Sequence, residues 1–184
     1  MNNPSTWRSN GAMSGTSGEA KRLEAICITL TGKMAEHYDI YYRVHAQTFG
    51  WLDWAKNGAP AGTAGYAKRL EGIQIVIVKK GEKIDENKNG IKSVNKSAYI
   101  ALSGTSPVVN SKPTSSMNPT IEGNSTPNVT YRTHVQTYGW QGWKFNGSMS
   151  GTSGQAKRLE GIEIKLTNKP YSGCLLYTSP SPRD

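Results

Sequence analysis

A unit built around tryptophan, glycine and a Lys-Arg-Leu-Glu run occurs three times in this chain and constrains its fold more than any other feature. Residues 50–75 read GWLDWAKNGAPAGTAGYAKRLEGIQI, and residues 139–164 read GWQGWKFNGSMSGTSGQAKRLEGIEI. A shorter copy at residues 7–28 reads WRSNGAMSGTSGEAKRLEAICI, without the strand-like segment that precedes the other two. A unit of this size buries too little surface to be stable alone, so we expect the copies to share a core.

The pattern within each copy predicts β-strands. Residues 40–47, IYYRVHAQ, alternate apolar and polar side chains, and residues 129–136, VTYRTHVQ, do the same. Each copy ends on a second alternating segment, as at residues 73–77 and 162–166. The fold class is therefore all-β, built from tandem antiparallel units. Such units could form an open array or close with threefold symmetry as β-prisms and trefoils do, and the sequence alone leaves both open.

Glycine marks two turns in each copy. The Asn-Gly step predicts a type I′ hairpin turn, because both residues tolerate positive φ. A Gly-Thr-x-Gly step follows, where we expect side chains to be too large. The turn residues are Asn57, Gly58, Gly62 and Gly65 in one copy, and Asn146 and Gly147 in another.

The spacing of the copies predicts four regions. Residues 1–81 hold a pair of copies, of which the first is truncated at its N-terminal side, and residues 128–173 hold a third copy. Residues 82–127 are rich in Ser, Thr, Asn and Pro and are expected to be a flexible linker, with a short strand as one reading of SAYIAL at residues 97–102. The truncated first copy predicts that the gene extends upstream of Met1.

The last eleven residues, CLLYTSPSPRD at 174–184, share no evident pattern with the repeats. They back-translate readily to a transposase adapter used to prepare sequencing libraries, so we predict that they are not native and exclude them from fold reasoning. The alternative is a genuine Ser/Pro-rich tail. Cys27 is then the only native cysteine, so no disulfide and no CxxC metal site is expected. We expect neither a metal nor a cofactor.

Composition narrows the partners. Lys and Arg number 22 and Asp and Glu 13, giving a net charge of +9 that favours acidic partners. The basic residues are scattered rather than clustered, which argues against nucleic acid, although aromatic platforms beside basic residues also suit single strands. No segment approaches the roughly 18 apolar residues that a membrane span needs, so we expect no membrane insertion.

Tryptophan and a polar row are the candidate binding groups. An indole offers a flat apolar face to a sugar ring and an N–H donor at its edge, while Arg, His and Gln offer donors and acceptors to hydroxyls. The alternatives are that the tryptophans are core and that the polar row is a structural network. The candidates are Trp7, Trp51, Trp54, Trp140 and Trp143, with Arg43, His45 and Gln47 in one row and Arg132, His134 and Gln136 in the other.

An Arg-x-Glu pair also recurs, and in a strand its two residues share one face. We expect a partly buried charge pair at the edge of the core rather than a catalytic acid, because glycosidases need a second carboxylate roughly 5–10 Å away. The chain offers no nucleophile elbow, triad or phosphate-binding glycine loop, so we expect no enzyme activity. The pairs are Arg22 with Glu24, Arg69 with Glu71, and Arg158 with Glu160.

The string Y-R-x-H-x-Q-x-x-G-W-x-x-W-x-x-N-G-x-x-x-G-T-x-G-x-x-K-R-L-E resembles the clostridial hydrophobic tryptophan repeat, or ChW repeat. The resemblance covers residues 42–78 and 131–166 in full and residues 7–30 in part. It implies a bacterial protein that is secreted or exposed on the cell surface, with repeats that serve as non-catalytic attachment units. On this basis we expect multivalent binding to polysaccharide or cell-wall glycan; the alternative is an adhesion module that binds surface proteins.

Overall fold

The computed structural model describes residues 7–9, 11–103, 107–108, 127–179 and 181–182. These residues form many short strands, one α-helix and one 3-10 helix. The strands are β1 Arg8–Ser9, β2 Ser14–Gly15, β3 Ala25–Leu30, β4 Tyr38–Ala46, β5 Gly50–Trp51, β6 Ala55–Lys56, β7 Ala61–Ala64, β8 Leu70–Lys79, β9 Tyr99–Ala101, β10 Pro107–Val108, β11 Asn128–Val135, β12 Gly139–Trp140, β13 Lys144–Phe145, β14 Ser150–Gly151, β15 Leu159–Thr167, β16 Leu175–Thr178 and β17 Ser181–Pro182. The helices are α1 Gly32–His37 and η1 Lys88–Gly90.

Each copy is organised around one antiparallel pair of long strands. In copy two (residues 38–79) β4 pairs with β8, and in copy three (residues 128–167) β11 pairs with β15. A short strand lies against the first long strand in the same place in both copies, β6 against β4 and β13 against β11. The predicted all-β architecture of antiparallel repeat units is confirmed.

Copy one (residues 7–30) obtains its first long strand from the other end of the chain. β16 pairs with β3 and with β1, and it aligns Tyr177 with Ile28. The same register aligns Tyr42 with Ile75 and Tyr131 with Ile164 in the other copies. Residues 174–178, which sequence reasoning set aside, therefore occupy a repeat position in this structure. Their origin in an adapter remains a prediction.

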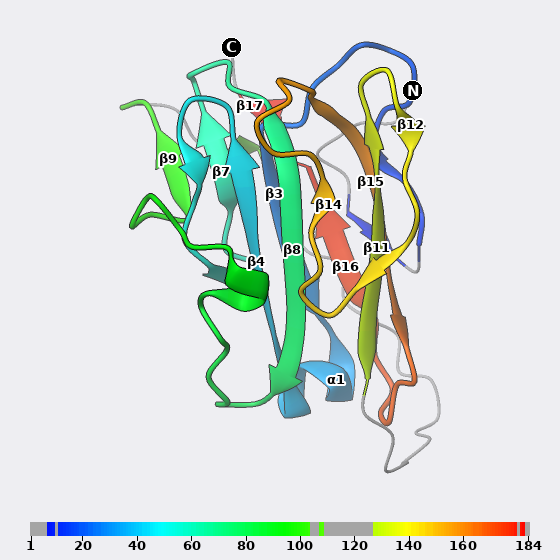
Figure 1. Ribbon diagram of the computed structural model, residues 1–184. Coiled ribbons are helices and arrows are strands. Elements are labelled where there is room, and N and C mark those ends of the chain that lie inside the picture. The colour runs from blue at the N-terminus through cyan, green and yellow to red at the C-terminus, as the bar shows by residue number, and fades with distance from the viewer. Residues whose placement is uncertain (1–6, 10, 104–106, 109–126, 180, 183–184) are drawn as a thin grey trace.

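The three copies close into a ring. Each copy lends a short strand to the long pair of the preceding copy: β7 pairs with β3, β14 with β8 and β2 with β15 (Figure 1). The Asn-Gly turns make the same link, with Gly58 N–H donating to Ile28 O, Gly147 N–H to Ile75 O and Gly11 N–H to Ile164 O. Copy one thus closes on copy three, which selects threefold closure over an open array. The long strands form three separate sheets, as in a β-prism.

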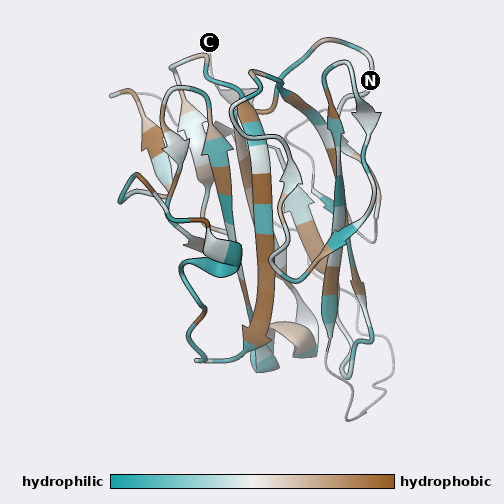
Figure 2. Ribbon diagram, in the orientation of Figure 1, coloured by the Kyte–Doolittle hydropathy of each residue, from teal (hydrophilic) through white to brown (hydrophobic). Residues whose placement is uncertain are grey.

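The core lies where the three sheets face one another. The inward positions of β4 are Ile40, Tyr42, Val44 and Ala46, all fully buried, and their counterparts in β11, β15 and β3 join one apolar cluster. Figure 2 shows the matching apolar stretch along the lower part of β8. The buried tyrosines carry their hydroxyls to the turns, since Tyr42 donates to Ala59 O, Tyr131 to Ser148 O and Tyr177 to Ala12 O. Each copy thereby ties its strand to its turn.

The Asn-Gly turns have the predicted backbone but not the predicted hairpin. Asn57 and Gly58 both have positive φ, of 47° and 92°, and Ala59 N–H closes the turn on Lys56 O. The strands on either side do not pair with each other, because β6 pairs within the copy and β7 pairs with the preceding copy. The hairpin prediction was wrong at this point, since a turn signal fixes local dihedrals and not the partner of the following strand.

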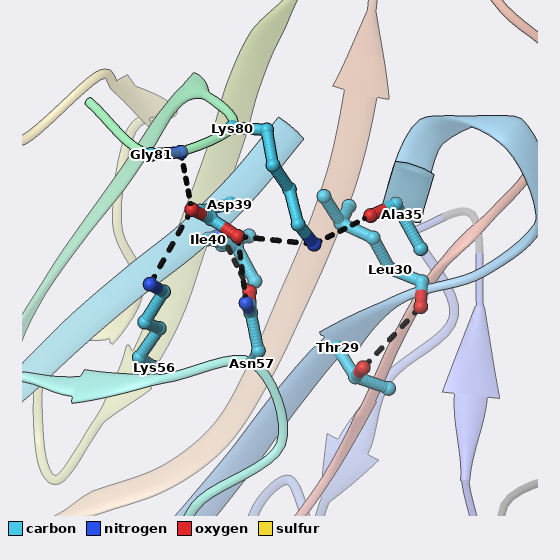
Figure 3. Close-up of polar contacts among 9 residues, drawn as sticks. All are labelled: Thr29, Leu30, Ala35, Asp39, Ile40, Lys56, Asn57, Lys80 and Gly81. Carbon is cyan, nitrogen blue, oxygen red and sulfur yellow. Dashed lines mark hydrogen bonds and ion pairs between the residues drawn. The ribbon is translucent and has the colours of Figure 1, made fainter. Parts of the chain in front are cut away.

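A buried carboxylate anchors the start of β4 (Figure 3). Asp39 Oδ1 accepts from Asn57 Nδ2 at 2.8 Å and Asp39 Oδ2 accepts from Gly81 N–H at 3.0 Å, and the ammonium groups of Lys56 and Lys80 lie 3.4 and 3.3 Å away. Burial raises the pKa of Asp39, but these hydrogen bonds and cations outweigh it and hold the pKa at about 2. The carboxylate therefore stays ionised.

The predicted linker differs from a free tether over residues 82–102. This stretch folds back on the repeats, with η1 near copy two and β9 pairing in parallel with β7, where the short strand was considered. Most of the remaining predicted linker, residues 104–106 and 109–126, lies outside the described residues. The helix α1, which joins β3 to β4 and buries Met34, was not anticipated from the sequence because six residues carry too short a periodic signal.

Candidate functional site

The two complete copies each hold an arginine between two tryptophans on the polar face of the first long strand. In copy three the Arg132 guanidinium carbon lies 4.9 Å from the Trp140 ring and 4.7 Å from the Trp143 ring. In copy two Arg43 lies 5.4 Å from Trp51 and 4.5 Å from Trp54. We call these the Arg132 stack and the Arg43 stack. A guanidinium over an indole face is an attractive cation–π contact.

Strand pairing builds the stack directly from the sequence spacing. The segment after β11 turns back along it, so β12 aligns Trp140 with His134 and β13 aligns Lys144 with Tyr131. Trp143, three residues after Trp140, directly precedes β13 and so lies farther along β11 than Trp140 does. Arg132 lies two residues from His134 and therefore points to the same face, between the two rings. Copy two repeats the register at His45 and Trp51.

A residue from the second long strand holds each arginine in place. Arg43 Nε donates to Gln74 Oε1 at 2.7 Å, and Arg132 Nε donates to Glu163 Oε2 at 2.7 Å. Copy one has Cys27 at this position, opposite Thr178. The position thus holds a polar side chain in the two copies where an arginine faces it. In copy one, where no arginine faces it, the position holds a buried thiol, and burial raises the pKa of this thiol to about 12.

The recurring Arg-x-Glu pair lies beside the stack and forms a network of charged side chains at the edge of the core. Glu160 is buried, Arg158 Nη2 lies 2.8 Å from its Oε1, and His134 Nδ1 lies 3.0 Å from its Oε2. The His134 ring meets the edge of Trp140 at an interplanar angle of 81°. The glutamate therefore orients the imidazole that supports one wall of the stack.

Copy two repeats this network with the same geometry. His45 Nδ1 lies 3.0 Å from Glu71 Oε2, and Arg69 Nη2 lies 2.9 Å from Glu71 Oε1. Burial lowers the pKa of His45, and Glu71 opposes that shift. His45 Nδ1 and Glu71 Oε2 are thus in close contact, but their geometry is not that of a hydrogen bond. Such a network is a fixed support, which agrees with the structural reading of the Arg-x-Glu pairs.

Residues 86–95 cover the Arg43 stack, and we call them the cap. Arg43 Nη2 donates to Ile91 O at 2.6 Å and Arg43 Nη1 donates to Ser93 Oγ at 2.8 Å, while Trp54 Nε1 donates to Glu86 O at 3.1 Å. In return, Val94 N–H donates to Trp51 O at 2.8 Å. The cap leaves Arg43 with 0% exposure and buries Trp51. The polar row of copy two is therefore not an open groove.

The Arg132 stack has no such cover among the described residues. The Arg132 side chain is 31% exposed, and Trp140 and Trp143 are half-buried. The guanidinium Nη atoms of Arg132 and the indole Nε1 of Trp143 have no protein acceptor among the described residues, although their counterparts in copy two each have one. Lys165 extends over the outer ring, its Nζ 4.3 Å from Trp143. Copy three thus presents the open version of the stack.

Copy one lacks a complete stack. Trp7 is half-buried, and Thr178 takes the arginine position in the β16 register. Arg22 Nε donates to Glu24 Oε1 at 2.5 Å, yet Glu24 Oε2 is buried without a hydrogen-bond partner in the described part of the chain. In copies two and three the equivalent oxygen lies 3.0 Å from a histidine Nδ1. The network needs a strand with the Arg-x-His pattern to be complete.

The last members of the polar rows lie outside the stacks. The Gln47 backbone N–H donates to Arg69 O, and the Gln136 backbone N–H donates to Arg158 O, so both lie at the bend that follows the first long strand. The described residues hold no group of His, Cys, Asp or Glu suited to bind a metal ion, and none of their helices is long and apolar enough to cross a membrane.

Sequence reasoning did not anticipate the cap. Its contacts use the backbone carbonyls of Ile91 and Glu86 and a single hydroxyl, that of Ser93, which any polar stretch can supply. One local signal was available, because Asn89-Gly90 is a turn pair and both residues have positive φ, of 57° and 73°. That turn folds the cap back toward the strand.

Comparison with known proteins gives one match. The model of the family described as "Clostridial hydrophobic W" matches residues 4–32, 45–79 and 134–168, which together make up more than half of the chain. The three matches coincide with copies one, two and three, and each includes the tryptophan equivalent to Trp54. No curated protein and no solved structure matches the chain.

Proposed function

This chain belongs to the clostridial hydrophobic W family, and on that premise we propose that it is a non-catalytic module that attaches to polysaccharide or cell-wall glycan. The observation that supports the proposal is the Arg132 stack, where two half-buried indoles flank a guanidinium with unoccupied donors. Indole rims and faces suit the C–H surface of a sugar ring, and forked N–H donors suit its hydroxyls. Secretion or display on the cell surface is part of the same proposal.

Positioned donors without a reactive group fit binding rather than catalysis. Two carboxylates lie at the stack and both are already engaged, Glu160 by Arg158 and Glu163 by Arg132. A carboxylate that is paired with a guanidinium in this way is not free to reach a ligand. We therefore propose that the module has no hydrolytic role of its own.

Multivalency in this proposal depends on the cap. The ring carries two complete stacks, and one of them is covered by residues 86–95. A polymer that engages the Arg132 stack gains avidity from the Arg43 stack only if the cap is displaced. Tethering a second site in this way raises apparent affinity by roughly 10²–10⁴ without new contacts.

The test is retention on insoluble glycans at about 0.5 M salt, where surface ion pairs are largely screened. We expect the wild-type protein to be retained and the Trp140→Ala/Trp143→Ala variant to pass through. Loss of wild-type retention with salt alone would assign binding to the net charge of +9 rather than to the stack. The variant must keep its thermal transition for the comparison to count.

Binding to a surface protein is the second candidate, and one observation favours it. The cap is itself a peptide seated on the Arg43 stack through main-chain carbonyls. A partner polypeptide could use the Arg132 stack in the same way. Retention on a deglycosylated surface protein with none on glycan would select this function over the first.

A further inference from the structure

The cap shows what chemistry the stack recognises. The Arg43 stack offers three donors to the cap, Arg43 Nη1, Arg43 Nη2 and Trp54 Nε1, and two of the three acceptors are amide carbonyl oxygens, those of Ile91 and Glu86. The third acceptor is the hydroxyl of Ser93. The stack also offers one acceptor, Trp51 O, which receives the amide N–H of Val94 at 2.8 Å and that of Asn95 at 3.3 Å. The stack therefore satisfies both ends of amide groups together with one hydroxyl.

The open stack carries the same set of groups. Arg132 Nη1 and Nη2 and Trp143 Nε1 correspond to the three donors, and Trp140 O corresponds to the acceptor, because the two copies share strand register at each of these positions. Among the described residues these donors have no protein partner. The Arg132 stack is therefore a preformed site whose covered twin already shows which acceptors fit.

We infer that the Arg132 stack binds a polysaccharide whose sugars carry N-acetyl groups. This inference rests on the proposed function and names the glycan class for that site. An acetamido group is the one common sugar substituent that offers a carbonyl acceptor and an N–H donor together, beside ring hydroxyls. Its carbonyl meets the Arg132 guanidinium, its N–H meets Trp140 O, and its methyl packs on the indole of Trp143. A polymer of unsubstituted hexoses has hydroxyls at these places and lacks the carbonyl acceptor.

Physical chemistry supports discrimination between the two kinds of sugar. A guanidinium is a donor only, and an amide carbonyl oxygen is an acceptor only, so the two groups are complementary. A site built for a specific polar group rejects a ligand that lacks it, because its desolvated donors are then left unpaired. The Glu163 carboxylate fixes the Arg132 fork through Nε, and both Nη atoms are left without a protein acceptor among the described residues. The donors are thus arranged before the ligand arrives.

The experiment titrates the full chain with neutral oligosaccharides and follows tryptophan fluorescence or calorimetric heat. The probes are a tetramer of β-1,4-linked N-acetylglucosamine, the matching cello-tetraose, and a synthetic peptide of residues 85–96. We expect the N-acetylated tetramer to bind at least tenfold more tightly than cello-tetraose. Both sugars are uncharged, so the net charge of the protein does not bias the comparison.

Two substitutions locate the binding. Trp143→Phe keeps a ring but removes the indole donor, and Arg132→Lys keeps the charge but removes the fork; each should weaken binding of the N-acetylated tetramer several-fold. Trp54→Phe makes the same change in the capped stack, where the indole donor is bonded to Glu86 O, and should not weaken binding of the tetramer. Equal losses in Trp54→Phe and Trp143→Phe would overturn the assignment to copy three.

The outcomes separate this inference from the proposed function. Equal binding of both tetramers keeps glycan attachment and overturns the N-acetyl assignment. Binding of neither tetramer, with binding of the peptide that Trp143→Phe weakens, overturns both and assigns the stack to polypeptide partners. Binding of none of the three probes rejects the stack as a ligand site.

Discussion

The ring predicts that glycines at the copy junctions are far less replaceable than glycines of similar backbone elsewhere. Gly151 in β14 has φ of +97°, and a Cβ on it would lie 2.4 Å from Glu71 O and 2.9 Å from Gly72 Cα in the preceding copy. Gly154, three residues later, has φ of +73° with nothing within 4 Å of a Cβ. The two sites share an unfavourable φ for an L-residue, but only one of them touches a neighbouring copy.

The magnitudes follow from that difference. Placing alanine at positive φ costs about 1–2 kcal/mol, partly offset by about 0.4–1 kcal/mol because alanine restricts the unfolded chain. Gly154→Ala should therefore lower the free energy of unfolding by about 1 kcal/mol. Gly151→Ala adds overlap with backbone atoms that cannot rotate away, and overpacking of this kind costs about 1–3 kcal/mol. We expect a total loss of about 2–4 kcal/mol.

Equilibrium unfolding in urea, followed by tryptophan fluorescence and circular dichroism, measures both values. Gly62→Ala and Gly15→Ala should resemble Gly151→Ala, since their Cβ atoms would lie 2.3 Å from Glu24 O and 2.4 Å from Glu160 O. Equal losses for Gly151→Ala and Gly154→Ala would refute the reasoning. They would mean that the junction between copies contributes nothing specific to stability.

Three further outcomes are expected. Asp39, whose pKa is held at about 2, stabilises the fold above pH 4 and loses that contribution as the pH falls toward 2. Because its two lysine partners are half exposed, we expect it to contribute about 1–2 kcal/mol to the free energy of unfolding. The urea midpoint of Asp39→Asn should therefore depend less on pH than that of the wild-type protein. Tyr131→Phe leaves Ser148 O and the Ile75 N–H without the hydroxyl, so the free energy of unfolding should fall by about 1–3 kcal/mol, whereas no change would show that water replaces it. Ser93→Ala removes a hydroxyl that accepts from Arg43 and donates to Leu52 O. Hydrogen exchange at the Val94 amide should therefore accelerate several-fold, while exchange in β11 stays constant. Acceleration at both places would indicate global loosening instead.

The sequence carried enough information for the strands and the local pairs. Alternation along residues 40–47 identified the buried face of β4, because a strand turns successive side chains to opposite sides. Spacing of two residues placed Arg158 beside Glu160 for the same reason. These features depend only on neighbours in the chain.

Contacts between copies were beyond that kind of reasoning. Gly58 N–H reaches Ile28 O in another copy, and nothing in the local turn signal names that acceptor. Two spaced groups at the end of the chain, Tyr177 and Ser179, take the positions that Tyr131 and Thr133 have in copy three. A pattern of two residues is too short to recognise in a serine-rich tail.

The candidate tryptophans were found, but their surroundings were not. Arg43 and Trp54 were named as candidate binding groups, and the structure stacks them on each other and covers them with the cap. Cover by main-chain carbonyls leaves no trace in composition, because every residue has one. The sequence alone therefore could not predict which stack is covered and which is open.

The direction of the junctions has a consequence for how proteins of this kind can lengthen. Among the described residues every copy passes its turn and short strand to the copy before it, and the first passes them to the third. A further unit could enter this ring only by displacing one of the three short strands, because each long pair already has one. Units joined in this way should accordingly fold in closed groups of three.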